Sequence, residues 1–132
     1  MAGLEKIETF LMDLGLPYEE VGSNTWLIDD SANGNPPIII SLVEPVVVIR
    51  ATVMKIPSPA ATGGNEQLFR ELLLLNGSGL AHGAYAIEGD DVVLIDTLEY
   101  GDMDRSELEA SLDAVSIALG EHWPRLSSFA SS

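Results

Sequence analysis

Ser78 stands among glycines in "LLLLNGSG" (residues 72–79), a setting in which serine nucleophiles and phosphate-binding loops occur. A nucleophile loop of the Gly-x-Ser-x-Gly type joins a strand to a following helix. Here a leucine-rich helical stretch precedes the serine, a strand pattern follows it, and no P-loop lysine is present. The glycines would also meet the C-terminal end of a helix, whose partial negative charge disfavours phosphate. We therefore interpret them as a helix end with a flexible joint into a strand.

The segment "DDSANGN" (29–35) has oxygen-bearing residues at the spacing of a calcium loop. Asp29, Ser31, Asn33 and Gly34 occupy the first, third, fifth and sixth positions of such a loop. The twelfth position, where a bidentate glutamate belongs, is Ile40, and the flanking residues have strand character. A turn between two strands is the better interpretation.

The two histidines, His82 and His122, have side chains that could bind zinc. Neither has a second histidine at helical spacing, and the chain has no cysteine. We expect each to be a surface or half-buried residue, and we expect no metal site and no cofactor. The lack of cysteine also excludes disulfides and thiolate catalysis.

Asp96 is the most unusual acidic residue, because its strand "VVLIDTL" places it on the same face as Val92, Leu94 and Leu98. A catalytic carboxylate at this position is conceivable. A hydrogen-bonded carboxylate on a half-exposed face is the commoner arrangement. The sequence supplies no second carboxylate with a positioned third group, so we expect that the protein is not an enzyme.

The composition is that of a folded but strongly acidic chain. Of 132 residues, 46% are hydrophobic, and 21 Asp and Glu against six Lys and Arg give a formal net charge of −15. This charge argues against nucleic acid and anionic membrane surfaces as partners, since both attract basic proteins. Basic or apolar polypeptides fit better, although adaptation to a high-salt cytoplasm would also produce an excess of acids.

The N-terminal stretch "MAGLEKIETFLMDLG" carries acids where a signal peptide would carry basic residues. No run approaches the roughly 18 consecutive apolar residues of a membrane span. We expect a cytoplasmic protein.

Hydrophobic periodicity and turn residues predict helices and strands in two groups. The expected elements are a helix at 4–14, strands at 25–29, 38–43 and 46–56, a loop at 57–65, a helix from 65 or 66 to about 76, strands at 82–88 and 92–100, and a helix from 102 or 104 to Pro124. Asp104 and Glu107 have the spacing of a capping box at the start of the last helix, and "EGDD" (88–91) predicts a hairpin turn.

Short turns between consecutive strands predict antiparallel pairing, and strands grouped apart from helices indicate an α+β fold. The predicted order is α-β-β-β-α-β-β-α, with the helices against one sheet. We expect one domain over residues 1–124 and a flexible tail over 125–132.

The second helix is more apolar than an ordinary amphipathic helix. Leu68, Leu72 and Leu75 share one face, and Phe69 and Leu73 extend this buried stripe to about half of the circumference. Leu74 falls instead on the side where solvent is expected, beside charged and polar residues. Either it is an isolated exposed leucine, or the helix lies at an interface with a second polypeptide.

Three sequence features resemble those of the YbjN family of bacterial proteins, which is related to the class I type III secretion chaperones. A leucine-rich helix ends in the pair Leu75-Asn76, and a strand with a small residue and an aromatic, Gly83 and Tyr85, follows it. The acidic hairpin at 88–91 then leads to another strand and the last helix. The resemblance covers nearly the whole chain and implies a chaperone-like fold.

The resemblance also implies a small homodimer that binds an extended segment of another polypeptide, with the second helix and the neighbouring strand near the interface. On this basis we expect a non-enzymatic chaperone-like or regulatory protein. The candidate interface or partner-binding residues are Phe69, Leu73, Leu74 and Tyr85. The alternative is a small-molecule or metal-dependent enzyme that uses Asp96 and neighbouring acids.

Overall fold

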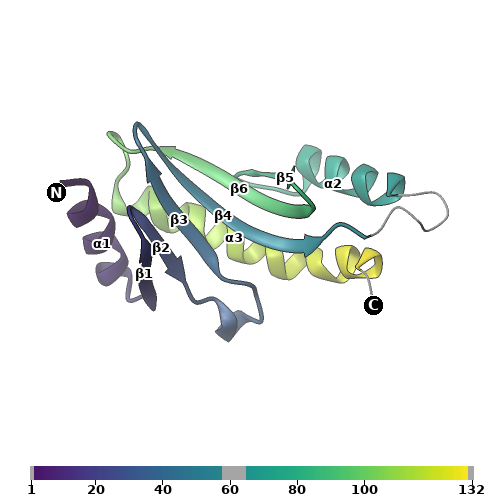
Figure 1. Ribbon diagram of the computed structural model, residues 1–132, viewed down its shortest axis with the longest axis horizontal. Coiled ribbons are helices and arrows are strands. Elements are labelled where there is room, and N and C mark those ends of the chain that lie inside the picture. The colour runs from purple at the N-terminus through teal and green to yellow at the C-terminus, as the bar shows by residue number, and fades with distance from the viewer. Residues whose placement is uncertain (1, 58–64, 131–132) are drawn as a thin grey trace.

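The computed structural model describes residues 2–57 and 65–130, which form three α-helices and one six-stranded sheet (Figure 1). The elements are α1 (Ala2–Leu14), β1 (Tyr18–Gly22), β2 (Thr25–Ile28), a 3-10 turn η1 (Ser31–Asn33), β3 (Ile38–Val43), β4 (Val46–Lys55), α2 (Glu66–Ser78), β5 (Ala84–Glu88), β6 (Asp91–Glu99), α3 (Arg105–Leu126) and a second 3-10 turn η2 (Ser127–Phe129). Most of the loop predicted at 57–65 lies outside the described residues.

The predicted α+β class with an antiparallel sheet is confirmed. The strands lie in the order β1-β2-β3-β4-β6-β5, and every neighbouring pair is antiparallel. The structure has one strand more than the sequence predicted, because β1 had not been expected. Its sequence "YEEVG" is almost entirely exposed at the edge of the sheet, so it lacks the apolar alternation by which strands are recognised.

One face of the sheet forms the core. Successive residues of a strand point to opposite faces, and in β3 and β4 alternate residues are buried. Val47, Ile49 and Ala51 of β4 lie on the buried face, while Arg50 and Thr52 lie on the other. The helices supply the rest of the same hydrophobic cluster, which joins residues from all three of them.

The long helix α3 runs along the sheet, with α1 near one end of the molecule and α2 near the other (Figure 1). Its first turn is closed by the predicted capping box: the Glu107 amide donates to Asp104 Oδ1 at 2.8 Å and the Asp104 amide donates to Glu107 Oε1 at 3.1 Å. Leu108, Leu112 and Val115 then pack into the core. Within residues 2–57 and 65–130, no helix combines the length and the apolarity that crossing a bilayer requires.

Polar contacts attach α1 to the sheet in addition to its buried residues Ile7 and Leu11. The buried Trp26 donates its indole N–H to Glu8 Oε2 at 3.1 Å, and Lys6 Nζ donates to the Tyr100 carbonyl at 2.6 Å. These bonds satisfy polar groups that packing would otherwise leave without partners.

The last helix does not end at Pro124, as predicted, but continues to Leu126. Proline has no N–H to donate to the carbonyl four residues earlier. For Pro124 this is the carbonyl of Gly120, an exposed residue, so water can donate to it instead. The helix therefore tolerates a proline in its last turn, and the Ser127 amide closes it by donating to the Trp123 carbonyl.

The continuation of the helix changes the interpretation of the predicted tail, residues 125–132. Leu126 is 1% exposed and belongs to the core, and Phe129 and Ala130 pack partly buried against it. Residues 131 and 132 lie outside the described part. In the sequence, Pro124 alone indicated the end of the helix. The helix nevertheless continues past it to Leu126, whose side chain is buried in the core.

We predict that Leu126→Ala lowers the free energy of unfolding by about 2–5 kcal/mol, because it leaves a cavity in the core. Equilibrium unfolding in urea measures this change. The control is Ser128→Ala, at an exposed position two residues further on, which should change stability little. Equal stabilities of the two variants would restore the interpretation of 125–132 as a tail.

Candidate functional site

The second helix, α2, buries one narrow stripe. Leu68, Leu72 and Leu75 point into the core and are at most 5% exposed. The sheet element that α2 packs against is β5, the strand at the edge of the sheet. A helix at a sheet edge is covered from one side only, and its remaining circumference faces outward.

The outward face of α2 is apolar. Leu73 is 70% exposed, Leu74 51% and Phe69 37%. The three line a shallow groove of about 690 Å³ together with Asn65, Glu66 and Arg70. We call this set of three side chains, Phe69, Leu73 and Leu74, the α2 face.

The prediction that Phe69 and Leu73 extend the buried stripe is wrong, because both belong to the exposed face. The helical wheel places Phe69 and Leu73 correctly beside the buried leucines. It does not tell how much of the helix circumference the rest of the protein covers, and here only the stripe of Leu68, Leu72 and Leu75 is covered. Leu74, which the sequence singled out, lies beside Leu73 in the same groove. Whether the α2 face is an interface stays a prediction at this point.

Tyr85, the fourth candidate residue, is buried in the chain itself and does not lie on the α2 face. Its side chain is 5% exposed. Its backbone is held by the side chain of Asn76: the Tyr85 amide donates to Asn76 Oδ1 at 2.6 Å, and Asn76 Nδ2 donates to the Tyr85 carbonyl at 3.1 Å. The Leu75-Asn76 pair in the last turn of α2, which continues to Ser78, therefore fixes α2 to β5, and a partner cannot reach the tyrosine ring in this arrangement.

The buried phenol of Tyr85 contacts the buried His122 of α3. Tyr85 Oη lies 2.6 Å from His122 Nδ1. Burial raises the pKa of the Tyr85 phenol, so the phenol remains protonated at neutral pH. A neutral imidazole can accept the hydrogen bond of the phenol at Nδ1, so His122 joins α3 to β5.

Burial also lowers the pKa of His122, because a charged imidazolium is poorly solvated there. Of the charged groups around the ring, Glu121 and Glu71 raise this pKa, and Arg125 lowers it. Arg125 itself forms an ion pair with Glu71, which ties α3 to α2 at the same point. The sequence predicted a surface or half-buried histidine, and the structure places it in the interior.

Both carboxylate oxygens of Asp96 form hydrogen bonds with groups of the fold itself. Its Oδ2 accepts a hydrogen bond from the buried Ser111 of α3 at 2.6 Å, and its Oδ1 accepts from the Thr97 amide at 3.0 Å. The strand β5 pairs with β6 only as far as Ala84 opposite Ile95, so the Thr97 amide lies beyond the paired part. The Asp96 carboxylate thus accepts a hydrogen bond from an amide at the open edge of β6, and through Ser111 it connects the sheet to α3.

The other candidate chemical groups remain apart. Ser78 Oγ donates to the Leu74 carbonyl one turn earlier in α2, and His82 is exposed. Residues 29–35 contain the 3-10 turn η1 (Ser31–Asn33), which is closed by Gly34 in a left-handed conformation. In the described part of the chain, no three Asp, Glu or His side chains are grouped so that they could hold a metal ion.

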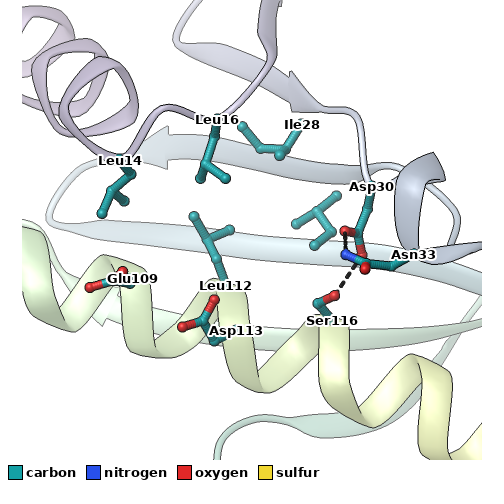
Figure 2. A pocket seen from close by; sticks show the side chains of 10 residues that line it. Leu14, Leu16, Ile28, Asp30, Asn33, Glu109, Leu112, Asp113 and Ser116 are labelled. Atoms are coloured by element: carbon teal, nitrogen blue, oxygen red, sulfur yellow. Dashed lines mark hydrogen bonds between the residues drawn. The ribbon is translucent and has the colours of Figure 1, made fainter.

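A second concave feature, which the sequence did not reveal, lies between α1, α3 and the end of β2 (Figure 2). This cavity of about 130 Å³, here called the α1–α3 cavity, is lined by Leu14, Leu16, Ile28, Asp30, Asn33, Ile38, Glu109, Leu112, Asp113 and Ser116. The lining residues of α3, from Glu109 to Ser116, have the spacing of one helix face. This spacing was the single indication of the cavity in the sequence. The other lining residues come from separate segments that only the fold brings together.

The fold described above is of the type III secretion chaperone-like class. The chain belongs to the CesT_Tir_1 family, whose family model matches residues 2–132. The predicted resemblance to YbjN and to the chaperones is thereby confirmed. No curated protein matches the sequence significantly.

Solved structures share the fold at low sequence identity. YbjN from E. coli is 15% identical, with a TM-score of 0.67 and 92% of each chain covered. A chain of the heterodimeric ExoU–SpcU complex from the type III secretion system of Pseudomonas aeruginosa is 21% identical, with a TM-score of 0.65 over 94% of this chain and 97% of that one. A chain of the HopA1–SchA chaperone–effector complex is 11% identical, with a TM-score of 0.61 over 92% and 97%.

We predict a pH dependence of stability that originates at His122. The pKa of this residue is lowered in the folded state from about 6.5 in the unfolded chain. The unfolded state therefore binds the proton first. The stability from the neutral histidine is fully present above about pH 6.5 and is lost as the pH falls through the lowered folded value.

Urea unfolding between pH 5 and 7.5 measures this effect, with His122→Gln as the variant that cannot titrate. The difference in unfolding free energy between wild type and variant should shrink as the pH falls. Curves that stay parallel over this range would contradict the assignment, since titration of the many carboxylates is common to both proteins.

Proposed function

We propose that this protein is a non-enzymatic homodimer that binds a segment of another polypeptide, and that the α2 face is the contact between the two copies. The observation that carries the proposal is the exposure of Phe69, Leu73 and Leu74 side by side on one helix. Contiguous exposed apolar side chains on a soluble protein mark interaction sites far more often than isolated ones. Each leucine that becomes well buried contributes about 1.5–3 kcal/mol.

Charge supports a symmetric contact. Two copies of an acidic chain repel one another, so their contact surface should be poor in acids. The groove contains the charged residues Glu66 and Arg70. Arg70 forms no ion pair within the part of the chain that the structure describes. In a two-fold contact each surface meets its own copy, so Arg70 of one copy can face Glu66 of the other.

The binding of another polypeptide is supported by the family and by the complexes that share the fold. HopA1–SchA is a chaperone–effector complex, and ExoU–SpcU is a heterodimer. In this chain, β1 is an edge strand whose residues 19–22 are exposed. An extended segment can add to such an edge through backbone hydrogen bonds. The opposite edge strand, β5, is less accessible to an added segment, because the Asn76 side chain already forms hydrogen bonds with the amide and the carbonyl of Tyr85.

We predict that Leu73→Asp converts a dimer into a monomer in sedimentation velocity at micromolar concentration. The substitution places a charge on each side of a symmetric apolar contact, and the loss of two buried leucines alone weakens dimerisation at least about a hundredfold. Leu74→Asp should act in the same direction. The folded monomer tolerates both changes, because the two side chains are exposed in the single chain.

The matched control is Ile117→Asp, at an apolar position on α3 that is 59% exposed and outside the groove. This variant should remain dimeric. A wild-type protein that sediments as a monomer, or a dimer that all three variants leave intact, would contradict the proposed role of the α2 face.

A further inference from the structure

The α1–α3 cavity has an apolar interior. Leu14 and Leu16 lie across it from Leu112 of α3, and Ile28 and Ile38 of the sheet complete the walls (Figure 2). Its volume of about 130 Å³ is close to that of a cavity that holds one benzene-sized group, about 150 Å³. The space suits one apolar side chain or alkyl chain.

Three carboxylates line the same cavity. Glu109 and Asp113 lie one turn apart on α3 and are exposed, and Asp30 follows β2 at the other end (Figure 2). Asp30 is held in place by neutral donors. Its Oδ1 accepts from Asn33 Nδ2 at 2.8 Å, and its Oδ2 accepts from Asn35 Nδ2 and from Ser116 Oγ, each at 2.8 Å.

Among residues 2–57 and 65–130, no basic side chain forms an ion pair with these acids. All six Lys and Arg residues lie in the described part of the protein, and none of them forms an ion pair with Asp30, Glu109 or Asp113. Arg105, one turn before Glu109 on α3, pairs with Asp13 at 3.7 Å instead. The donors on Asp30 carry no net charge. The cavity therefore combines an apolar interior with an uncompensated negative lining.

We propose that the α1–α3 cavity receives a lysine side chain of the bound polypeptide, an inference that rests on the proposed function. The four methylene groups of lysine occupy the apolar interior, as lysine stems do against apolar surfaces. The ammonium group has three donors that point in different directions, which suits the two exposed carboxylates of α3, Glu109 and Asp113, one turn apart. A planar guanidinium favours a single carboxylate in a two-pronged contact, whereas Glu109 and Asp113 are two separate carboxylates on successive turns of α3.

The test is an NMR titration of the methyl-labelled protein at low salt with Nα-acetyl-lysine N-methylamide. The probe should shift the methyl signals of Leu14, Leu16 and Leu112 first. The norleucine analogue has the same stem without the charge and should bind more weakly. Glu109→Gln combined with Asp113→Asn should weaken lysine binding by roughly two- to twentyfold, as expected for two exposed charges.

The matched control is Asp102→Asn with Glu121→Gln, which removes the same number and types of charge at exposed positions outside the cavity. It should bind the lysine probe as the wild type does. Three outcomes would overturn the proposal: no shift at the cavity, equal binding of the norleucine probe, or tighter binding of the corresponding arginine amide.

Random-peptide display on wild type and on the cavity double variant separates this inference from the proposed function. Enriched peptides that contain lysine on the wild type, and lose it on the variant, support both. Enriched peptides without a lysine preference would support polypeptide binding and overturn the lysine anchor. A lysine amide that fills the cavity while no peptide is enriched would support the chemistry of the cavity and contradict the proposed function.

Discussion

The attachment of α2 to the edge of the sheet determines which surfaces of this protein remain available. The amide side chain of Asn76 bonds both backbone groups of Tyr85, as a neighbouring strand would. The buried Leu75 fixes the same end of the helix from within, and the Tyr85–His122 contact ties the strand β5 to α3. With the helix held there, one stripe of leucines points inward and the α2 face necessarily points outward.

The two candidate surfaces lie at different ends of the molecule, because α2 is near one end of α3 and α1 is near the other (Figure 1). Dimerisation at the α2 face and occupation of the α1–α3 cavity therefore need not compete. The net charge of −15 also acts differently at each. It opposes association of two copies, so the contact between them depends on apolar burial, whereas it attracts a lysine-bearing segment to the cavity.

Local rules predicted the elements that local interactions form: the capping box of α3, the hairpin before β6 and the leucine stripe of α2. Features that depend on the surroundings could not be predicted. The strand β1 carries no apolar pattern because its residues are exposed, and Leu126 is buried although a proline precedes it. The burial of Tyr85 and the exposure of Leu73 follow from where α2 meets the sheet, which no periodicity records. The cavity combines residues from α1, β2, β3 and α3.

Hydroxyl-radical footprinting over a concentration series tests most directly whether a second copy of the chain covers the α2 face. As the protein concentration rises from nanomolar to tens of micromolar, oxidation of Phe69, Leu73 and Leu74 should fall. Oxidation of Met12 and Ile117, which are exposed elsewhere, should stay constant. An α2 face that is oxidised equally at every concentration would contradict the account.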